Sequence, residues 1–214
     1  MELITELLEF WQTRYPKILQ YTLEHITISF LAVLFGILLT LPLGIYLTRM
    51  KFKPVRETIF GIANVFQTIP TIALLAIMIP LLGIGTTPAI VALFLYSLLP
   101  LLRNTFAGIK SVDPGVIESA RGMGLSPVQT LFKIEIPLAF PYIISGIKVT
   151  TVYVISWTTL AAVIGAGGLG DLILAGIGLN SKVLIITGTI SAILLALLAD
   201  LVLGFVEKKV TKQR

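Results

Sequence analysis

One polar stretch decides the fold: Asp113-Pro114-Gly115-Val116-Ile117-Glu118-Ser119-Ala120-Arg121-Gly122-Met123-Gly124, continuing through Leu125-Ser126-Pro127 to Ile134-Glu135-Ile136-Pro137. It is the longest polar interruption in an otherwise apolar sequence. Its turn and capping residues predict two short helices that meet at an elbow, which we place at residues 110–136. We expect Pro137 to end this unit and to lead into the next membrane span.

Each helix of the elbow carries its own start signal. Asp113 can cap the first helix, because Pro114 follows at the first helical position, where a missing N–H is tolerated. Glycines at 122 and 124 can supply the stop and the bend. Ser126 can cap the second helix, and Gln129 falls where a capping box requires it.

The spacing within this stretch resembles a family signature. Glu118-Ser119-Ala120, then Gly124, then Ile134-x-Ile136-Pro137 is similar to the "EAA" signature of importer permeases driven by ATP-binding cassettes: Glu-Ala-Ala, three residues, Gly, nine residues, Ile-x-Leu-Pro. Ser119 and Ile136 are the two departures. The resemblance implies a cytoplasmic coupling helix that docks on an ATPase subunit; the alternative is a solvated connection with ordinary caps. The coupling residues implied are Glu118, Ser119, Ala120, Arg121, Gly122, Met123, Gly124 and Leu125.

Composition excludes an ordinary soluble domain. The 214 residues are 56% hydrophobic and 13% charged, with a mean hydropathy of +0.98. Long charge-free stretches instead predict an all-α membrane protein, a polytopic bundle of about five transmembrane helices. The chain has no cysteine, so disulfides and cysteine nucleophiles are excluded.

Hydropathy and turn residues divide the chain into three parts. Residues 1–20 predict an N-terminal helix lying in the membrane interface and interrupted near Pro16. Residues 21–206 predict the transmembrane domain, and residues 207–214 a basic cytoplasmic tail. The expected spans are 26–47, 58–82, 87–108, 138–164 and 183–205, with a loop or re-entrant segment at 165–182.

Lysine and arginine positions predict the orientation. Twelve fall at the ends of spans on the side of the elbow and the C-terminus, and three fall on the other side. The positive-inside rule then places the elbow and the C-terminus in the cytoplasm and the N-terminus outside. We therefore expect a multi-pass protein of the cytoplasmic (inner) membrane of a prokaryote, surrounded by lipid.

The glycine-rich run 165–171 matches two motifs that we set aside. It fits the G-x-G-x-x-G pattern of dinucleotide sites, but it follows a membrane span rather than a strand. It also fits the G-x-G-D element of membrane proteases, which need a second carboxylate, and Asp200 is expected on the opposite membrane side. Small residues that allow close backbone approach are the better interpretation. The run resembles the outer gate of importer permeases, which implies gate residues Gly165, Gly167, Gly168, Gly170 and Asp171.

Polar and aromatic residues are few within the spans, and such residues usually face the bundle interior or a wet cavity. They can line a translocation path or form hydrogen bonds between helices. The candidates for the path are Asn64, Gln67, Thr68, Pro70, Tyr96, Tyr153 and Trp157. The three aromatic residues lie on two spans, and we do not expect them to assemble a cage.

Three other polar residues near the spans are expected to have structural roles. Lys148 and Asp200 are expected to pair or to snorkel. His25 is expected at the membrane interface.

Further segments resemble the small permeases of osmoprotectant uptake systems for glycine betaine, carnitine and choline. The segments are Pro42–Gly44, Phe66–Pro70, Pro80–Gly85, Leu99–Asn104 and Gly165–Asp171. The resemblance implies ATP-binding cassette ATPase subunits, a second permease chain (identical or homologous) and an extracytoplasmic substrate-binding protein. A methionine permease and an ATP-independent secondary transporter or channel remain alternatives.

The chain is not expected to be an enzyme. It contains no Walker A motif, so we expect ATP and Mg²⁺ to bind on the partner ATPase. We predict no catalytic residue, no metal site, no cofactor held by this chain and no nucleic-acid partner.

Overall fold

A computed structural model describes the backbone of residues 2–212 and the side chains of residues 3–209, and within this range every regular element is helical. Lys212 and Arg214, two basic residues of the predicted tail, have side chains outside the described residues. The elements are α1 (Glu2–Arg49), α2 (Lys53–Thr68), α3 (Thr71–Leu82), α4 (Thr86–Lys110), α5 (Pro114–Gly122), α6 (Pro127–Thr130), a π-helix (Leu131–Glu135), α7 (Ile136–Ala161), a 3₁₀ turn (Ala162–Ile164), α8 (Leu169–Gly178) and α9 (Lys182–Lys212).

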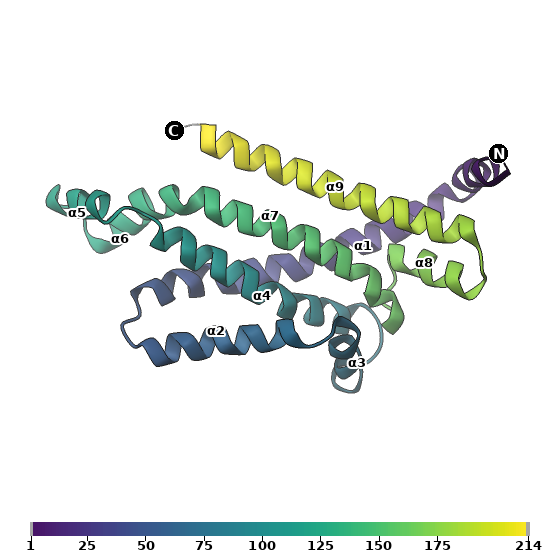
Figure 1. The fold of residues 1–214 in the computed structure, drawn as a ribbon, viewed down its shortest axis with the longest axis horizontal. Helices are drawn as coiled ribbons and strands as arrows, with labels where there is room; N and C mark the ends of the chain where they lie inside the picture. The colour runs from purple at the N-terminus through teal and green to yellow at the C-terminus, as the bar shows by residue number, and fades with distance from the viewer. Residues whose placement is uncertain (1, 213–214) are drawn as a thin grey trace.

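The long helices run side by side along one axis (Figure 1). The helix α4 packs against both α1 and α7, and α9 packs against α7 and α8. The helices α5 and α6 extend from one end of the bundle, where the α1–α2 connection and the end of α9 also lie, whereas α1 begins at the opposite end (Figure 1). The three segments predicted to be basic and cytoplasmic are thus grouped at one end.

Helix α1 differs from the prediction, because it continues through Pro16 without interruption. A helix of 48 residues is about 72 Å long, more than twice the hydrocarbon thickness of a bilayer. Its first turns point in a different direction from the remainder (Figure 1). The predicted interruption near Pro16 was therefore wrong, while an interfacial position for the first part of α1 stays a prediction.

The predicted span 58–82 was also wrong as a single helix. The chain breaks between α2 and α3, which meet at an angle of 101°. Ile69 is extended, with φ −71° and ψ 129°, because the residue before a proline is disfavoured in the α-helical region, and Pro70 cannot donate to the preceding turn. Four helical segments are long and apolar enough to cross a membrane, and the bent pair makes up to five.

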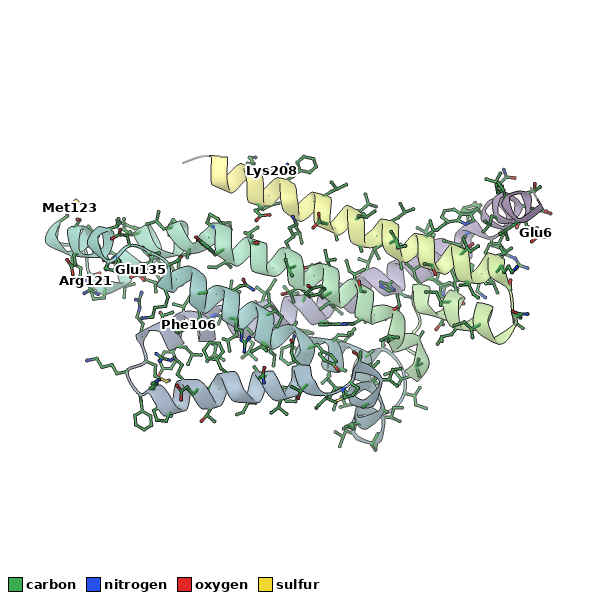
Figure 2. The ribbon with its side chains drawn as sticks, viewed as in Figure 1. Glu6, Phe106, Arg121, Met123, Glu135 and Lys208 are labelled. Carbon is green, nitrogen blue, oxygen red and sulfur yellow. The ribbon has the colours of Figure 1, made fainter. Side chains whose placement is uncertain are left out.

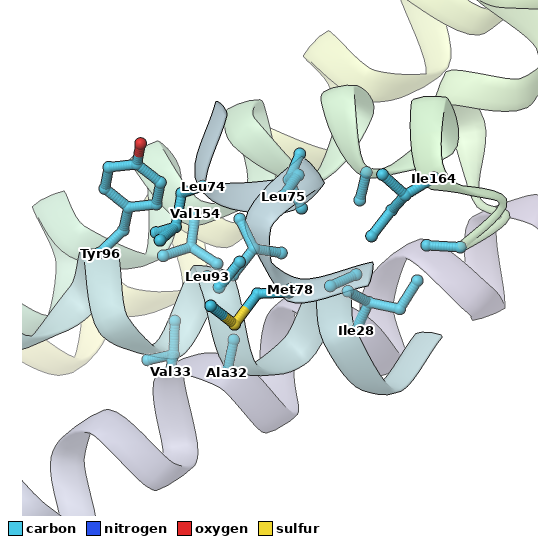
Figure 3. Close-up of a cluster of buried hydrophobic side chains, with 14 residues drawn as sticks. Ile28, Ala32, Val33, Leu74, Leu75, Met78, Leu93, Tyr96, Val154 and Ile164 are labelled. Carbon is cyan, nitrogen blue, oxygen red and sulfur yellow. The ribbon is translucent and has the colours of Figure 1, made fainter. Parts of the chain in front are cut away.

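The main hydrophobic core forms where α3 crosses the bundle (Figure 3). Leu74, Leu75 and Met78 of α3 are buried with Leu93 of α4 and Val154 of α7. The helix α3 has only 12 residues, about 18 Å, so it covers the bundle at one level rather than spanning it. This packing holds the bend between α2 and α3 in one orientation.

Candidate functional site

The first elbow helix, α5, begins as the sequence predicts. The Oδ1 atom of Asp113 accepts a hydrogen bond from the backbone N–H of Gly115 at 2.6 Å, and Pro114 occupies the first helical position. The cap satisfies one of the N–H groups that a helix start leaves unpaired. Val112, just before the cap, is buried in a cluster with Ile109 and α7 residues, so the start of α5 is fixed to the bundle.

The bend after α5 is a Schellman motif centred on Gly124. The backbone N–H of Leu125 donates to the carbonyl of Ala120 at 3.2 Å, and that of Gly124 donates to the carbonyl of Arg121 at 2.9 Å. Gly124 has φ +85°, a left-handed conformation that favours glycine. Gly122 ends α5 without positive φ, so the bend depends on Gly124 and not on both glycines.

The second elbow helix begins with the predicted capping box. Ser126 Oγ accepts from the N–H of Gln129 at 3.3 Å, and Gln129 Oε1 accepts from the N–H of Ser126 at 2.9 Å. The end of this unit was predicted wrongly: α6 runs through the π-helix directly into α7, without a stop at Pro137. Pro137 is the second residue of α7, immediately after the π-helix, and the helical chain continues through it.

The elbow tip exposes apolar and charged side chains together. Ala120 is buried, which explains a small residue there, while Arg121 and Met123 lie at the tip (Figure 2). Met123 is 72% exposed. The remaining large apolar side chains exposed on the elbow are Val116, Val128 and Phe132. A cluster of exposed apolar groups rimmed by charges is typical of a protein-binding surface.

The carboxylate of Glu135 is a site residue that the sequence analysis did not single out. Glu135 lies at the base of the elbow (Figure 2), is only 2% exposed, and forms an ion pair with the guanidinium of Arg49, the last residue of α1. The signal available in the sequence was a lone acid in an apolar run that enters a membrane span.

The predicted path residues separate into two groups. Gln67, Tyr96 and Trp157 come together: Gln67 Nε2 donates to the carbonyl of Tyr96 at 2.9 Å, and the rings of Tyr96 and Trp157 are 5.0 Å apart. Tyr153 extends the row, with its ring 5.8 Å from that of Trp157, and is 52% exposed. The three rings thus form a row, because α4 and α7 pack directly against each other. The expectation that they do not assemble a cage stays a prediction.

The other three path candidates, Asn64, Thr68 and Pro70, lie on α2 and at the α2–α3 break and are exposed. The hydroxyl of Thr68 donates to the carbonyl of Val65 at 2.7 Å within its own helix. These residues are thus available to a neighbouring chain or to the path, and do not bind the aromatic row.

The glycine-rich run lies at the end of the bundle opposite the elbow, where α1 holds it (Figure 1). Glu24 Oε2 accepts from the N–H of Gly168 at 3.0 Å, and His25 Nδ1 accepts from the N–H of Leu169 at 3.3 Å. Because a backbone N–H only donates, Nε2 of His25 carries the proton and donates to the carbonyl of Ile155 at 2.9 Å. The His25 side chain is fully buried within the protein, while its expected position at the level of the membrane interface stays a prediction.

Close backbone approach explains the glycines. A Cβ atom on Gly170 would lie 2.0 Å from the carbonyl oxygen of Thr159, and one on Gly167 would lie 2.6 Å from Glu24 Oε2. Gly165, Gly167 and Gly168 also have φ between +71° and +83°. Part of the segment predicted as a loop or re-entrant stretch is the helix α8, which begins immediately after these turns.

Asp171 lies in the first turn of α8, outside the helices long enough to span a membrane. Burial raises the pKa of the Asp171 carboxyl, and the nearby charge of Glu24 raises it further, whereas Lys17 lowers it. Asp200 is engaged elsewhere: it pairs with Lys148 at 3.3 Å, as the sequence predicts, and Glu207 contacts the same lysine at 3.6 Å. In the part of the chain that the structure describes, no group of three His, Asp or Glu is placed to hold a metal ion.

The sequence matches a known family over most of its length. The family model described as "Binding-protein-dependent transport system inner membrane component" matches residues 40–212. The choline transport system permease protein OpuBB of Bacillus subtilis is 48% identical over 96% of this chain and 94% of its own length. The glycine betaine/carnitine/choline permease protein OpuCB of the same organism is 46% identical over 97% and 95%. The carnitine transport permease protein OpuCB of Listeria monocytogenes is 46% identical over 94% and 92%.

Solved structures agree in fold. An inward-facing structure of the MetNI methionine ABC transporter superposes with a TM-score of 0.79 at 25% identity, over 90% of this chain and 95% of the matched chain. An amino acid ABC transporter superposes with a TM-score of 0.78 at 20% identity, over 92% and 95%, which is a likeness of fold alone.

Proposed function

The chain belongs to the family of binding-protein-dependent transport system inner membrane components, and we propose that it forms the translocation path of an ATP-driven importer for small quaternary ammonium osmoprotectants. The observation that carries the proposal is the high identity, over nearly the whole chain, to permeases named for choline, glycine betaine and carnitine. The chain is a permease subunit of an ABC importer. What we propose is the cargo that it carries and the partners that it binds.

Coupling to a separate ATPase is supported by the elbow. The elbow combines an ordered Schellman bend with exposed apolar side chains, Met123 at its tip and Phe132 on the π-helix, which are suited to a groove on another protein. The base of the elbow is also rigid, because α6 continues through the π-helix into α7 without an intervening loop. A displacement of the tip would therefore be transmitted to a helix that reaches the opposite end of the bundle.

The orientation proposed is that of the positive-inside rule. The α1–α2 connection, the elbow and the end of α9 lie at one end of the bundle, and each contributes lysines or arginines (Figure 1). We place this end in the cytoplasm and the start of α1 outside. The extracytoplasmic binding protein would then deliver cargo at the end that contains α3, α8 and the glycine run.

Transport in this scheme is alternating access. ATP closes the dimer of ATPase subunits, the elbows move with them, and two permease chains open toward the binding protein. Hydrolysis resets the inward-facing state. The free energy for the shift is the higher affinity of ATP for the closed motor, because a ligand moves an equilibrium only by its differential affinity for the two states.

The cargo assignment is tested by reconstitution in proteoliposomes with the ATPase and binding-protein partners. We expect ATP-dependent uptake of choline, glycine betaine or carnitine, and none with a non-hydrolysable ATP analogue. Methionine is the second candidate, because of the likeness to MetNI, and its uptake in place of the quaternary amines would overturn the assignment. Solute flux through liposomes holding this chain alone would instead identify an ATP-independent transporter or channel.

A further inference from the structure

The ion pair between Glu135 and Arg49 connects the elbow to the far end of the longest helix. Glu135 ends the π-helix between α6 and α7, and such irregular turns occur frequently at functional sites. Its carboxylate is 2% exposed, while the Arg49 side chain is 44% exposed. A charge buried to this degree is costly unless it is paired, so the arginine is required wherever the glutamate is kept.

This ion pair is distinguished by where its two residues lie in the fold and not by its interaction energy. Arg49 is the last residue of α1, and Glu135 is the last residue before α7. Apolar contacts support the same junction, since Leu41 and Ile45 of α1 and Ile136 at the start of α7 pack against one cluster of buried residues. The base of the elbow is thereby fastened to α1 at the end that is also proposed to meet the ATPase.

The same helix contacts the glycine run near its midpoint. Glu24 and His25 accept hydrogen bonds from the backbone N–H groups of Gly168 and Leu169. Residues 24 and 49 are separated by 25 helical steps, about 37 Å along the axis. One continuous helix therefore contacts the elbow and the predicted outer gate, with an ion pair at its last residue and two hydrogen bonds near its midpoint.

We propose that Glu135 and Arg49 are positioning residues that fasten the coupling elbow to α1, so that elbow displacement moves α1 and, through Glu24 and His25, the glycine run. The inference rests on the proposed function, because it requires an ATPase that moves the elbow. A pair that serves stability alone would change protein yield and melting temperature but not the amount of cargo moved per ATP.

The first test compares charge-removal variants in the reconstituted complex with its ATPase and binding protein. We expect Glu135→Gln and Arg49→Gln to keep ATP hydrolysis and to lower uptake per ATP about five- to tenfold, the size of a typical coupling between sites. The double variant should be no worse than either single one, since both remove the same interaction. It also leaves no unpaired charge, so it remains informative where Arg49→Gln fails to fold. Arg49→Lys, which keeps the cation, should retain most of the coupling.

The matched control is the pair Lys53–Glu57, which lies at the same end of the bundle, 3.6 Å apart, and is exposed on both sides. Removing its charges should leave uptake per ATP unchanged. Equal losses at both pairs, or normal uptake per ATP in the Glu135→Gln and double variants, would overturn the proposal. A wild-type complex without ATP-driven uptake would instead refute the proposed function, and this inference with it.

The second test measures a change at the glycine run directly. The chain has no cysteine, so Val163→Cys, at an exposed position just before the glycine run, takes a single fluorescent label. We expect ATP to change its emission in the complex, and Glu135→Gln to reduce that change by about fivefold. An unchanged response with Glu135→Gln would show that the elbow reaches the glycine run by another route.

Discussion

The hydroxyl of Tyr96 on α4 donates a hydrogen bond to the carbonyl of Ile69, the residue that follows the last residue of α2. The break at Pro70 releases carbonyl groups from helical pairing, and in a membrane such groups must find partners within the protein. Gln67 completes the arrangement by donating to the backbone carbonyl of Tyr96. The bend between α2 and α3 is thus held by one tyrosine on the neighbouring helix.

Tyr96→Phe should destabilise the bend. The ring still fills its buried position, but the carbonyl of Ile69 loses a partner, at a cost of about 1–3 kcal/mol. Thermal unfolding in detergent measures the loss. Tyr153→Phe, at a half-exposed ring in the same aromatic row, is the control and should melt like the wild type. Equal melting temperatures for the two variants would mean that the hydroxyl of Tyr96 does not hold the break.

Gly124→Asp should leave the chain inserted in the membrane and uncouple ATP hydrolysis from transport. A side chain at φ +85° strains the Schellman bend, and a new charge is added to the surface proposed to meet the ATPase. Uptake per ATP is the measurement. Gly122→Ala, where φ is not positive and no atom lies within 4 Å of the added carbon, is the control. Wild-type uptake by Gly124→Asp at normal expression would contradict the coupling role of the bend.

Gly170→Ala should separate α8 from α7. The added methyl would lie 2.0 Å from the carbonyl oxygen of Thr159, a backbone atom that cannot rotate away. Overpacking of this kind costs about 1–3 kcal/mol and occasionally more. The expected result is a lower melting temperature and reduced monodispersity in detergent. Gly178→Ala, which meets only open space, should behave as the wild type; a stable Gly170→Ala protein would show that α8 moves freely.

Asp171→Asn should stabilise the protein near neutral pH and lose that advantage in acid. The folded pKa of Asp171 is raised by burial and by Glu24, so the folded state holds this proton more tightly than the unfolded state. The carboxylate therefore opposes folding at neutral pH, and the penalty disappears as pH falls through the folded pKa toward the unfolded value of 3.8. Melting temperatures of both proteins across this range measure the effect. Glu6→Gln, at an exposed acid, is the control; a difference that grows in acid would contradict the sign.

Local backbone chemistry was readable from the sequence alone. The caps at Asp113 and Ser126 and the bend at Gly124 each depend on residues within about five positions of one another. Hydropathy likewise placed the spans of α4, α7 and α9, because the length of a membrane span is set by the bilayer. Proline did not reliably indicate where a helix ends, because the α2–α3 break falls at Pro70 whereas Pro16 and Pro42 lie inside α1. Packing against neighbouring helices decides whether a helix breaks or continues at a proline. A short stretch of sequence does not contain this information.

The contacts that join distant segments were decided only by the tertiary structure. Arg49 meets Glu135 across 86 positions, and Glu24 meets Gly168 across 144. The aromatic row likewise needs α4 against α7, as the burial of His25 needs Ile155 beside α1. Each of these pairs consists of polar or aromatic groups whose partner is chosen by which helices lie side by side. Composition determined that this chain would bury such groups in a helical bundle, and helix packing determined which group each one met.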